Sequence, residues 1–179
     1  MRHSLRHLAA LAACLFLAGC FVSETPLITP DQADYPVELP AHYLVYKLDE
    51  NGKRTDRAPR EASVTREKAD YLYKVGNSPE TSGIAEAVGN GDYIVQTHSV
   101  TKPGVNIYGL IRKTKTGWLR WSPNCSDFVR TLKKDGKTLQ DFNISRKGND
   151  CTFANYDALK RAMKAYIAYA APDTEYVKE

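Results

Sequence analysis

Short runs of aromatic and β-branched residues, separated by turn residues, recur along most of this chain. Such runs favour β-strands, and pairs such as Asn-Gly between them favour tight hairpin turns. The sequence predicts strands at 42–48, 70–75, 92–98, 105–113 and 117–121, and shorter strands at 62–64, 142–144 and 151–153. Since hairpin turns join antiparallel neighbours, we expect an antiparallel bent sheet or small β-barrel of about six to eight strands.

The last part of the chain carries the clearest helical pattern. Asn155 suits an N-cap, Asp157 suits the first turn, and Pro172 ends the segment. Apolar residues recur between them at helical spacing, namely Leu159, Ala162, Met163, Tyr166, Ile167 and Ala170. A shorter helix is expected to start at Ser126 and one helical turn at Ser78. The expected fold class is therefore α+β, with the C-terminal helix packed on the sheet.

The first twenty residues differ in composition from the rest. A basic start with Arg2 and Arg6 leads into an apolar run from Leu8 to Ala18. That order, followed by small residues, is typical of a secretory signal peptide. The run is about half the roughly 20 residues that a membrane-spanning helix needs, which favours a signal peptide over a transmembrane segment.

The motif Leu17-Ala18-Gly19-Cys20 resembles the lipobox of bacterial lipoproteins. The resemblance implies that residues 1–19 are removed and that Cys20 carries diacylglycerol, usually with an acyl chain such as palmitate on its amine. It also implies a cell-membrane protein that is lipid-anchored and faces the periplasm. In that family an aspartate after the cysteine favours the inner membrane, so Phe21 favours the outer membrane. The remainder of the chain resembles no family.

Residues 20–40 are expected to form the lipidated cysteine and a proline-rich tether. Four prolines in this segment, at positions 26, 30, 36 and 40, disfavour a helix or a central strand and favour extended backbone. The alternative is that part of the segment lies along the domain surface. Residues 41–179 then form a single globular domain, because about 140 residues suffice for one core but not for two ordinary domains.

The resemblance also decides the expected state of the cysteines. Cys14 lies in the removed segment and Cys20 is lipidated, which leaves Cys125 and Cys151 in an oxidising compartment. A disulfide between them is predicted. A redox-active pair is less favoured, because such pairs usually have C-x-x-C spacing. His42 and His98 remain as the histidines of the mature chain and show no ligand spacing, so neither a metal nor a cofactor is expected.

The charge of the mature chain is close to neutral. Removal of Arg2 and Arg6 from 25 basic residues leaves 23, against 21 acidic residues. A nucleic-acid partner needs a concentrated basic face, so we expect none.

Candidate chemistry in the domain is sparse. His98 stands beside Ser99, but the chain has no G-x-S-x-G turn, so no catalytic residue is assigned and an enzyme is not expected. Trp118 and Trp121 are three residues apart on a predicted strand and therefore point to opposite faces. One of them is expected to lie on a surface used for binding.

These observations favour a non-enzymatic envelope protein whose β domain binds another envelope protein or a cell-wall component. One alternative is a periplasmic inhibitor of a cell-wall hydrolase, since small lipid-anchored barrels that block lysozyme are similar in size and class. Their Ser-Gly-x-x-Tyr pattern is not matched here, because Ser82-Gly83 is followed by Ile84-Ala85-Glu86. A second alternative is an enzyme on envelope polymers, for which a deep pocket with convergent acids would speak.

Overall fold

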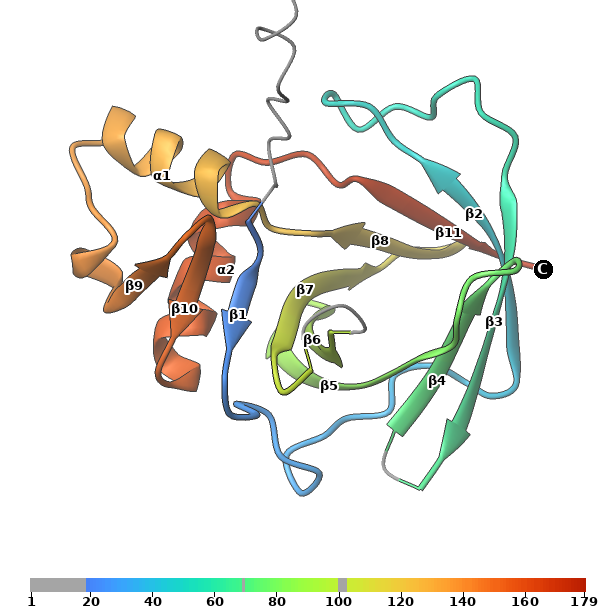
Figure 1. Cartoon of the computed structure of the whole chain (residues 1–179). Helices are drawn as coiled ribbons and strands as arrows, with labels where there is room; N and C mark the ends of the chain where they lie inside the picture. The colour runs from blue at the N-terminus through green and yellow to red at the C-terminus, as the bar shows by residue number, and fades with distance from the viewer. Residues whose placement is uncertain (1–18, 69, 100–102) are drawn as a thin grey trace, which may run out of the picture.

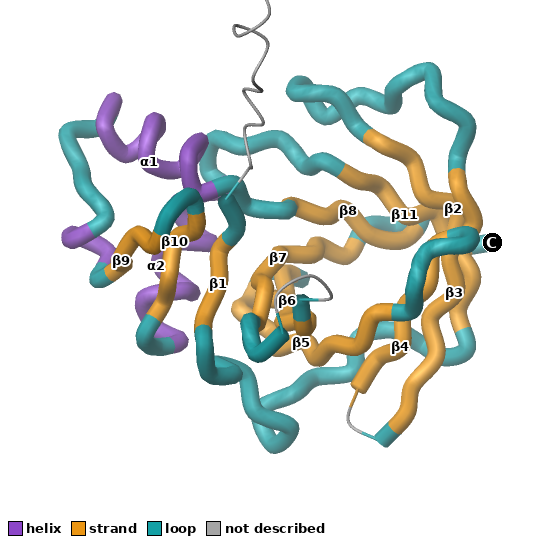
Figure 2. The backbone as a smooth tube through the Cα atoms, viewed as in Figure 1, coloured by secondary structure: helices purple, strands orange, loops and turns teal. Residues whose placement is uncertain are grey.

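Eight strands close into a barrel in the computed structural model, which describes residues 19–68, 70–99 and 103–179 (Figures 1 and 2). The barrel strands are β2 (Ala41–Lys47), β3 (Arg60–Glu67), β4 (Asp70–Val75), β5 (Thr81–Gly89), β6 (Asp92–His98), β7 (Asn106–Lys113), β8 (Gly117–Trp121) and β11 (Thr174–Lys178). Their order is β6-β5-β4-β3-β2-β11-β8-β7, every neighbour is antiparallel, and a β6–β7 pairing closes the ring. The predicted α+β small barrel with a C-terminal helix is confirmed.

A second layer lies beside the barrel, at the left of Figure 1. It comprises β1 (Phe21–Ser23), α1 (Cys125–Lys134), the 3₁₀ turn η1 (Gln140–Phe142), β9 (Ile144–Lys147), β10 (Asp150–Phe153) and α2 (Tyr156–Ile167). β1 pairs antiparallel with the first residues of β7 and parallel with β10, and β9 continues the sheet beyond β10. The two helices pack on this extension, so the main hydrophobic core lies between them and the outer side of the barrel.

Strands β6, β7 and β8 have apolar residues on both faces. On β7, Tyr108 and Leu110 are buried in the core shared with the helices, whereas Ile107, Gly109 and Ile111 line the barrel interior. Alternate residues of a strand point to opposite faces, and here both faces are covered by protein. These strands therefore form the wall between the helical core and the barrel interior.

The two helices begin at asparagine caps. The Asn124 side chain accepts hydrogen bonds from the backbone N–H groups of Ser126 and Asp127, at 2.9 and 3.2 Å. The Asn155 side chain accepts one from Ala158, at 2.9 Å. Such bonds satisfy N–H groups that have no partner within the helix. The cap predicted at Asn155 is confirmed. No helix among the described residues is long and apolar enough to cross a membrane.

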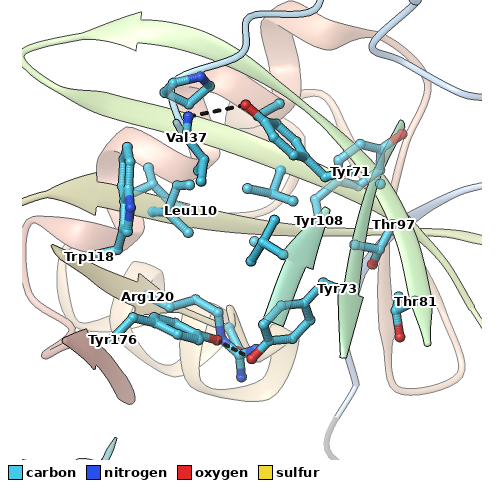
Figure 3. A pocket seen from close by; sticks show the side chains of 18 of the residues that line it. Val37, Tyr71, Tyr73, Thr81, Thr97, Tyr108, Leu110, Trp118, Arg120 and Tyr176 are labelled. Carbon is cyan, nitrogen blue, oxygen red and sulfur yellow. Dashed lines mark hydrogen bonds between the residues drawn. The ribbon is translucent and has the colours of Figure 1, made fainter. Parts of the chain in front are cut away.

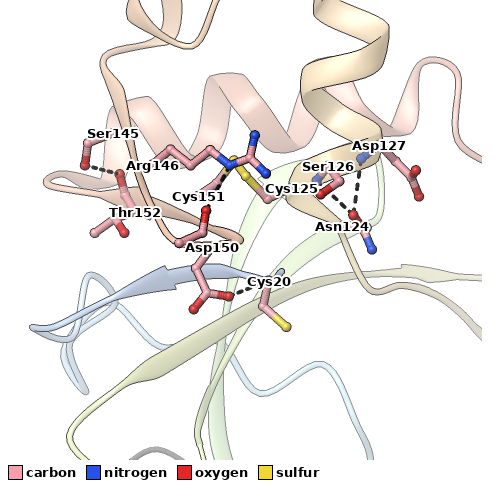
Figure 4. Close-up of a disulfide and its surroundings, with 11 residues drawn as sticks. Cys20, Asn124, Cys125, Ser126, Asp127, Ser145, Arg146, Asp150, Cys151 and Thr152 are labelled. Atoms are coloured by element: carbon pink, nitrogen blue, oxygen red, sulfur yellow. Dashed lines mark hydrogen bonds between the residues drawn. A yellow bond between two sulfur atoms is a disulfide. The ribbon is translucent and has the colours of Figure 1, made fainter. Parts of the chain in front are cut away.

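The predicted disulfide is present between Cys125 and Cys151 (Figure 4). Both residues are fully buried, and their Cα atoms are 5.3 Å apart. The bond joins the first residue of α1 to β10, so it holds the helical layer against the sheet extension.

The interpretation of residues 20–40 as a tether is wrong, because much of the segment packs on the domain. Phe21 and Ile28 are fully buried, and Phe21 contacts the aromatic rings of Phe128 and Phe153. The prolines restrict the backbone, but the apolar residues between them gain more from burial than from extension into water. The expected signal peptide falls on residues of which only Gly19 is described, and it stays a prediction.

Candidate functional site

The barrel interior is not filled by side chains. It contains a cavity of ≈ 250 Å³ (Figure 3). An eight-stranded barrel is just wide enough either to be filled by its own side chains or to hold one small ligand. The cavity is therefore the candidate functional site.

Small residues on β5 and β7 leave this space open. Gly83, Ala85 and Gly109 line the cavity and contribute few or no side-chain atoms. A Cβ at Gly83 would lie 2.6 Å from the backbone oxygen of Gln96, so the close approach of β5 to β6 requires glycine there. Because Gly83 has no side chain, the backbone itself forms the wall of the cavity at that point.

Aromatic and aliphatic side chains form most of the lining. The aromatic members include Tyr43, Tyr71, Tyr73, Trp118 and Tyr176, and the aliphatic members include Val64, Val95, Ile107 and Ile111. The Trp118 indole N–H donates to the Tyr43 hydroxyl at 3.2 Å, so its polar atom is satisfied inside the barrel. The site is thus largely apolar, with a few hydroxyl groups at fixed positions.

Residues 35–40, which we call the strap, cover one end of the cavity. The Val37 backbone N–H donates to the Tyr71 hydroxyl at 3.1 Å, at the top of the view in Figure 3. The Tyr35 ring packs edge-on against the Tyr71 ring, with centroids 5.8 Å apart, and the Arg66 guanidinium lies 4.5 Å from the Tyr35 ring. The strap is part of the segment expected to be a tether, and the structure places it against the barrel instead.

Arg120 lies on the other side of the cavity, beside Tyr73 and Tyr176 (Figure 3). Among the described residues that line the cavity, Arg120 alone is charged. Its Nη2 atom donates to Asp173 Oδ1 at 3.4 Å. Its Nε atom is buried and has no hydrogen-bond partner in the structure.

Asp173 keeps its charge beside Arg120. Burial alone would raise the pKa of Asp173, but the Arg120 charge and hydrogen bonds from Thr174 and Ser122 outweigh it, so this pKa lies below its ordinary value. Burial likewise opposes the charge of Arg120, but Tyr176 and Asp173 outweigh it and raise its pKa. Both groups are therefore ionised at neutral pH.

The hydroxyl groups of Tyr73 and Tyr176 share one hydrogen bond, which leaves one hydroxyl hydrogen to be donated elsewhere. Burial, followed by the nearby Tyr176, raises the pKa of Tyr73, so Tyr73 remains a neutral phenol. Its hydroxyl donates to the Tyr176 oxygen at 3.1 Å. The Tyr176 hydroxyl hydrogen can then be donated to another acceptor.

The structure corrects the expectation for the tryptophans. Trp118 and Trp121 do point to opposite faces of β8, but their exposed fractions are only 6 % and 4 %. Trp118 faces the cavity, and the Trp121 indole N–H donates to the Ala170 backbone oxygen at 2.8 Å on the helical side. Neither lies on the outer surface, because protein covers both faces of this strand.

Arg120 was not singled out from the sequence. Its one signal is that it stands two residues after Trp118 and so shares that face of the strand. The alternation alone does not say that this face lies inside a closed barrel. Only the pairing of β6 with β7 makes it an interior face.

Cys20 lies where the chain enters β1 (Figure 4). Its backbone N–H donates to Asp150 Oδ1 at 2.9 Å, and its carbonyl accepts from Cys151 N–H at 2.9 Å. The lipidation of Cys20 stays a prediction. Among the residues that the structure describes, no group of three His, Cys, Asp or Glu side chains is placed to hold a metal ion.

The fold and the cavity define a closed antiparallel barrel with an unfilled, largely apolar interior, whose described lining residues include one arginine. Comparison with protein-family models, curated proteins and solved structures found no match to this chain. The function is therefore inferred from the cavity.

Proposed function

We propose that this protein is a binding protein that holds one small, largely apolar molecule inside its barrel. The observation that carries the proposal is the unfilled cavity of ≈ 250 Å³ with its apolar and aromatic lining. Ligand sites are usually concave and apolar, with a few polar groups that orient the ligand. The barrel interior has these properties.

The apolar lining supports this proposal. The cavity is partly open to solvent, so water can contact these apolar side chains until a ligand covers them. Burying apolar surface contributes roughly 25 cal/mol per Å². A bound apolar molecule would therefore gain free energy from its contacts with the lining.

The structure offers less support for the functions favoured by the sequence. The described residues that line the cavity include no carboxylate and no histidine, so convergent acids of the kind expected for an enzyme on polymers are not found there. The exposed large hydrophobic residues of the described chain are Tyr35 and Tyr169, which lie on the strap and after α2. Binding to another envelope protein, inhibition of a hydrolase and the lipid anchor stay predictions.

The proposal is tested with a neutral apolar dye that fluoresces in apolar surroundings, such as N-phenyl-1-naphthylamine. We expect saturable binding of one dye per chain. The variant Val95→Phe fills the cavity, because Val95 lines it, and is expected to weaken dye binding by at least about tenfold. The matched control is Leu44→Phe, since Leu44 lies on the face of β2 opposite the buried Tyr43 and Val45.

Two results would contradict the proposal. One is the absence of saturable dye binding to the folded protein. The other is equal binding by Val95→Phe, Leu44→Phe and the unaltered protein, which would place the dye outside the barrel.

A further inference from the structure

We infer that the cavity binds a carboxylate, so that its ligand is a single-chain carboxylic acid whose head group lies on Arg120. This inference rests on the proposed function, because it names the chemical class of the molecule inside the barrel. It is carried by the position and the hydrogen-bonding state of Arg120 and Tyr176.

The first observation is an unused donor inside an apolar cavity. The Nε–H group of Arg120 is buried and has no partner, although the side chain lines the cavity. A buried donor without an acceptor is unfavourable, and a donor on a charged group is especially so. An acceptor supplied by the ligand would satisfy it.

The second observation is that Arg120 and Tyr176 can both donate a hydrogen bond at this place. Tyr176 accepts from Tyr73, which leaves its own hydrogen unused, and a guanidinium has no acceptor. Two converging donors match a group that only accepts hydrogen bonds. An ionised carboxylate is such a group, and it forms its strongest hydrogen bonds with arginine.

The local charge favours an anion. Lys47 Nζ lies 4.0 Å and Arg120 Nη2 lies 3.4 Å from Asp173 Oδ1. The positive charge of Arg60 also acts on the neighbouring Tyr73. These positive groups outnumber the carboxylate of Asp173, so an anionic head group is favoured over a neutral one.

The polarity of the lining and the volume of the cavity indicate the rest of the ligand. Away from Arg120 the lining is mostly aliphatic and aromatic, with the side chains of Thr81 and Thr97 at one side, as far as Val37 in the strap. A cavity of about 150 Å³ holds one benzene molecule. The larger volume here suits an alkyl chain that runs from Arg120 toward Val37.

The test compares decanoate with 1-decanol, which has the same chain and no charge. Both are titrated into the purified full-length protein near pH 8 in buffer without detergent, because detergent chains would compete for the cavity. We expect decanoate to bind at least about tenfold more tightly than 1-decanol. This comparison requires no variant and therefore does not depend on the folding of one.

Variants then locate the carboxylate. Arg120→Met keeps the length of the side chain and is expected to abolish the preference for decanoate, and Tyr176→Phe is expected to reduce it several-fold. The control is Arg112→Met, since Arg112 is paired with Asp92 and lies over the Trp121 ring rather than in the cavity. With decanoate labelled at its carboxyl carbon, the NMR titration should show a lowered carboxyl pKa in the complex only when Arg120 is present.

The outcomes separate this inference from the proposed function. Equal binding of decanoate and 1-decanol, together with saturable dye binding, would overturn the carboxylate assignment and leave the apolar binding function intact. A preference for decanoate that survives in Arg120→Met would also overturn it. If neither the dye nor decanoate binds, the proposed function itself fails.

Discussion

Gln96 and Ile28 are joined by two hydrogen bonds of opposite direction. The Ile28 backbone N–H donates to Gln96 Oε1 at 3.0 Å, and Gln96 Nε2 donates to the Ile28 backbone oxygen at 3.1 Å. Gln96 lies on β6 with its side chain outside the cavity, and Ile28 belongs to the segment that leads from β1 to the strap. The Gln96 side chain therefore makes the hydrogen bonds to the Ile28 backbone that a neighbouring strand would otherwise make.

Loss of this pair should destabilise the domain. In Gln96→Leu the side chain has a similar size, but the Ile28 N–H and C=O are left without partners, and Leu27 N–H and the Tyr108 hydroxyl also lose an acceptor. We expect the free energy of unfolding in urea to fall by about 2–4 kcal/mol. The exposed Gln140→Leu is the control, and an equal loss in both variants would contradict this role of Gln96.

Gly117 should tolerate alanine poorly. It has φ = +153° at the start of β8, and a Cβ there would lie 2.0 Å from the Tyr176 backbone oxygen across the strand pair. Gly117→Ala must therefore push β11 away from β8 and is expected to destabilise the protein by more than about 3 kcal/mol.

Gly148 provides the matched comparison for Gly117. It also has positive φ, at +62°, but a Cβ there would meet no atom within 4 Å. Gly148→Ala is expected to lose only about 1–2 kcal/mol from backbone strain. Thermal unfolding of the two variants measures the difference, and equal melting temperatures would show that the β8–β11 contact is not tight.

The charge of Asp173 should make stability depend on pH in the acid range. Burial raises the pKa of Asp173, but Arg120 and hydrogen bonds lower it further, so the net pKa is below the ordinary 3.8. A carboxyl with a lowered pKa in the folded state stabilises the protein above pH 3.8 and loses that contribution as the pH falls through the lowered pKa. The unaltered protein should therefore lose more stability than Asp173→Asn between about pH 4 and pH 2.

Denaturation in urea at several pH values measures this difference. Other carboxyl groups titrate in both proteins, so the informative quantity is the difference between the two curves. If the free energy of unfolding falls equally with pH in both proteins, the charge of Asp173 does not stabilise the folded state.

Local sequence patterns were sufficient for the elements whose residues favour one conformation strongly. The strands at 42–48, 92–98 and 117–121 and the helix after Asn155 were predicted close to their observed bounds. In each case the pattern depends on near neighbours in the chain, such as alternation along a strand or a cap one turn before a buried face.

Three strands were not predicted, because their strand conformation depends on distant partners. β5 contains Gly83, Ala85 and Ala87, which are weak strand formers, and a helical turn was expected just before it. β11 follows Pro172 and fills the position between β2 and β8, and β1 lies in the presumed tether. Their backbone hydrogen bonds are made to residues far away in the sequence, so no local pattern specifies them.

The sequence by itself determined the class of fold, the C-terminal helix and the Cys125–Cys151 pairing, since these follow from short-range periodicity and from the small number of available cysteines. Only the tertiary structure decided that the face of β8 shared by Trp118 and Arg120 is an interior face. That outcome depends on ring closure between β6 and β7 and on small residues such as Gly83 facing the same space. The alternation of a strand specifies two faces, but what covers each face is decided by contacts between distant parts of the chain.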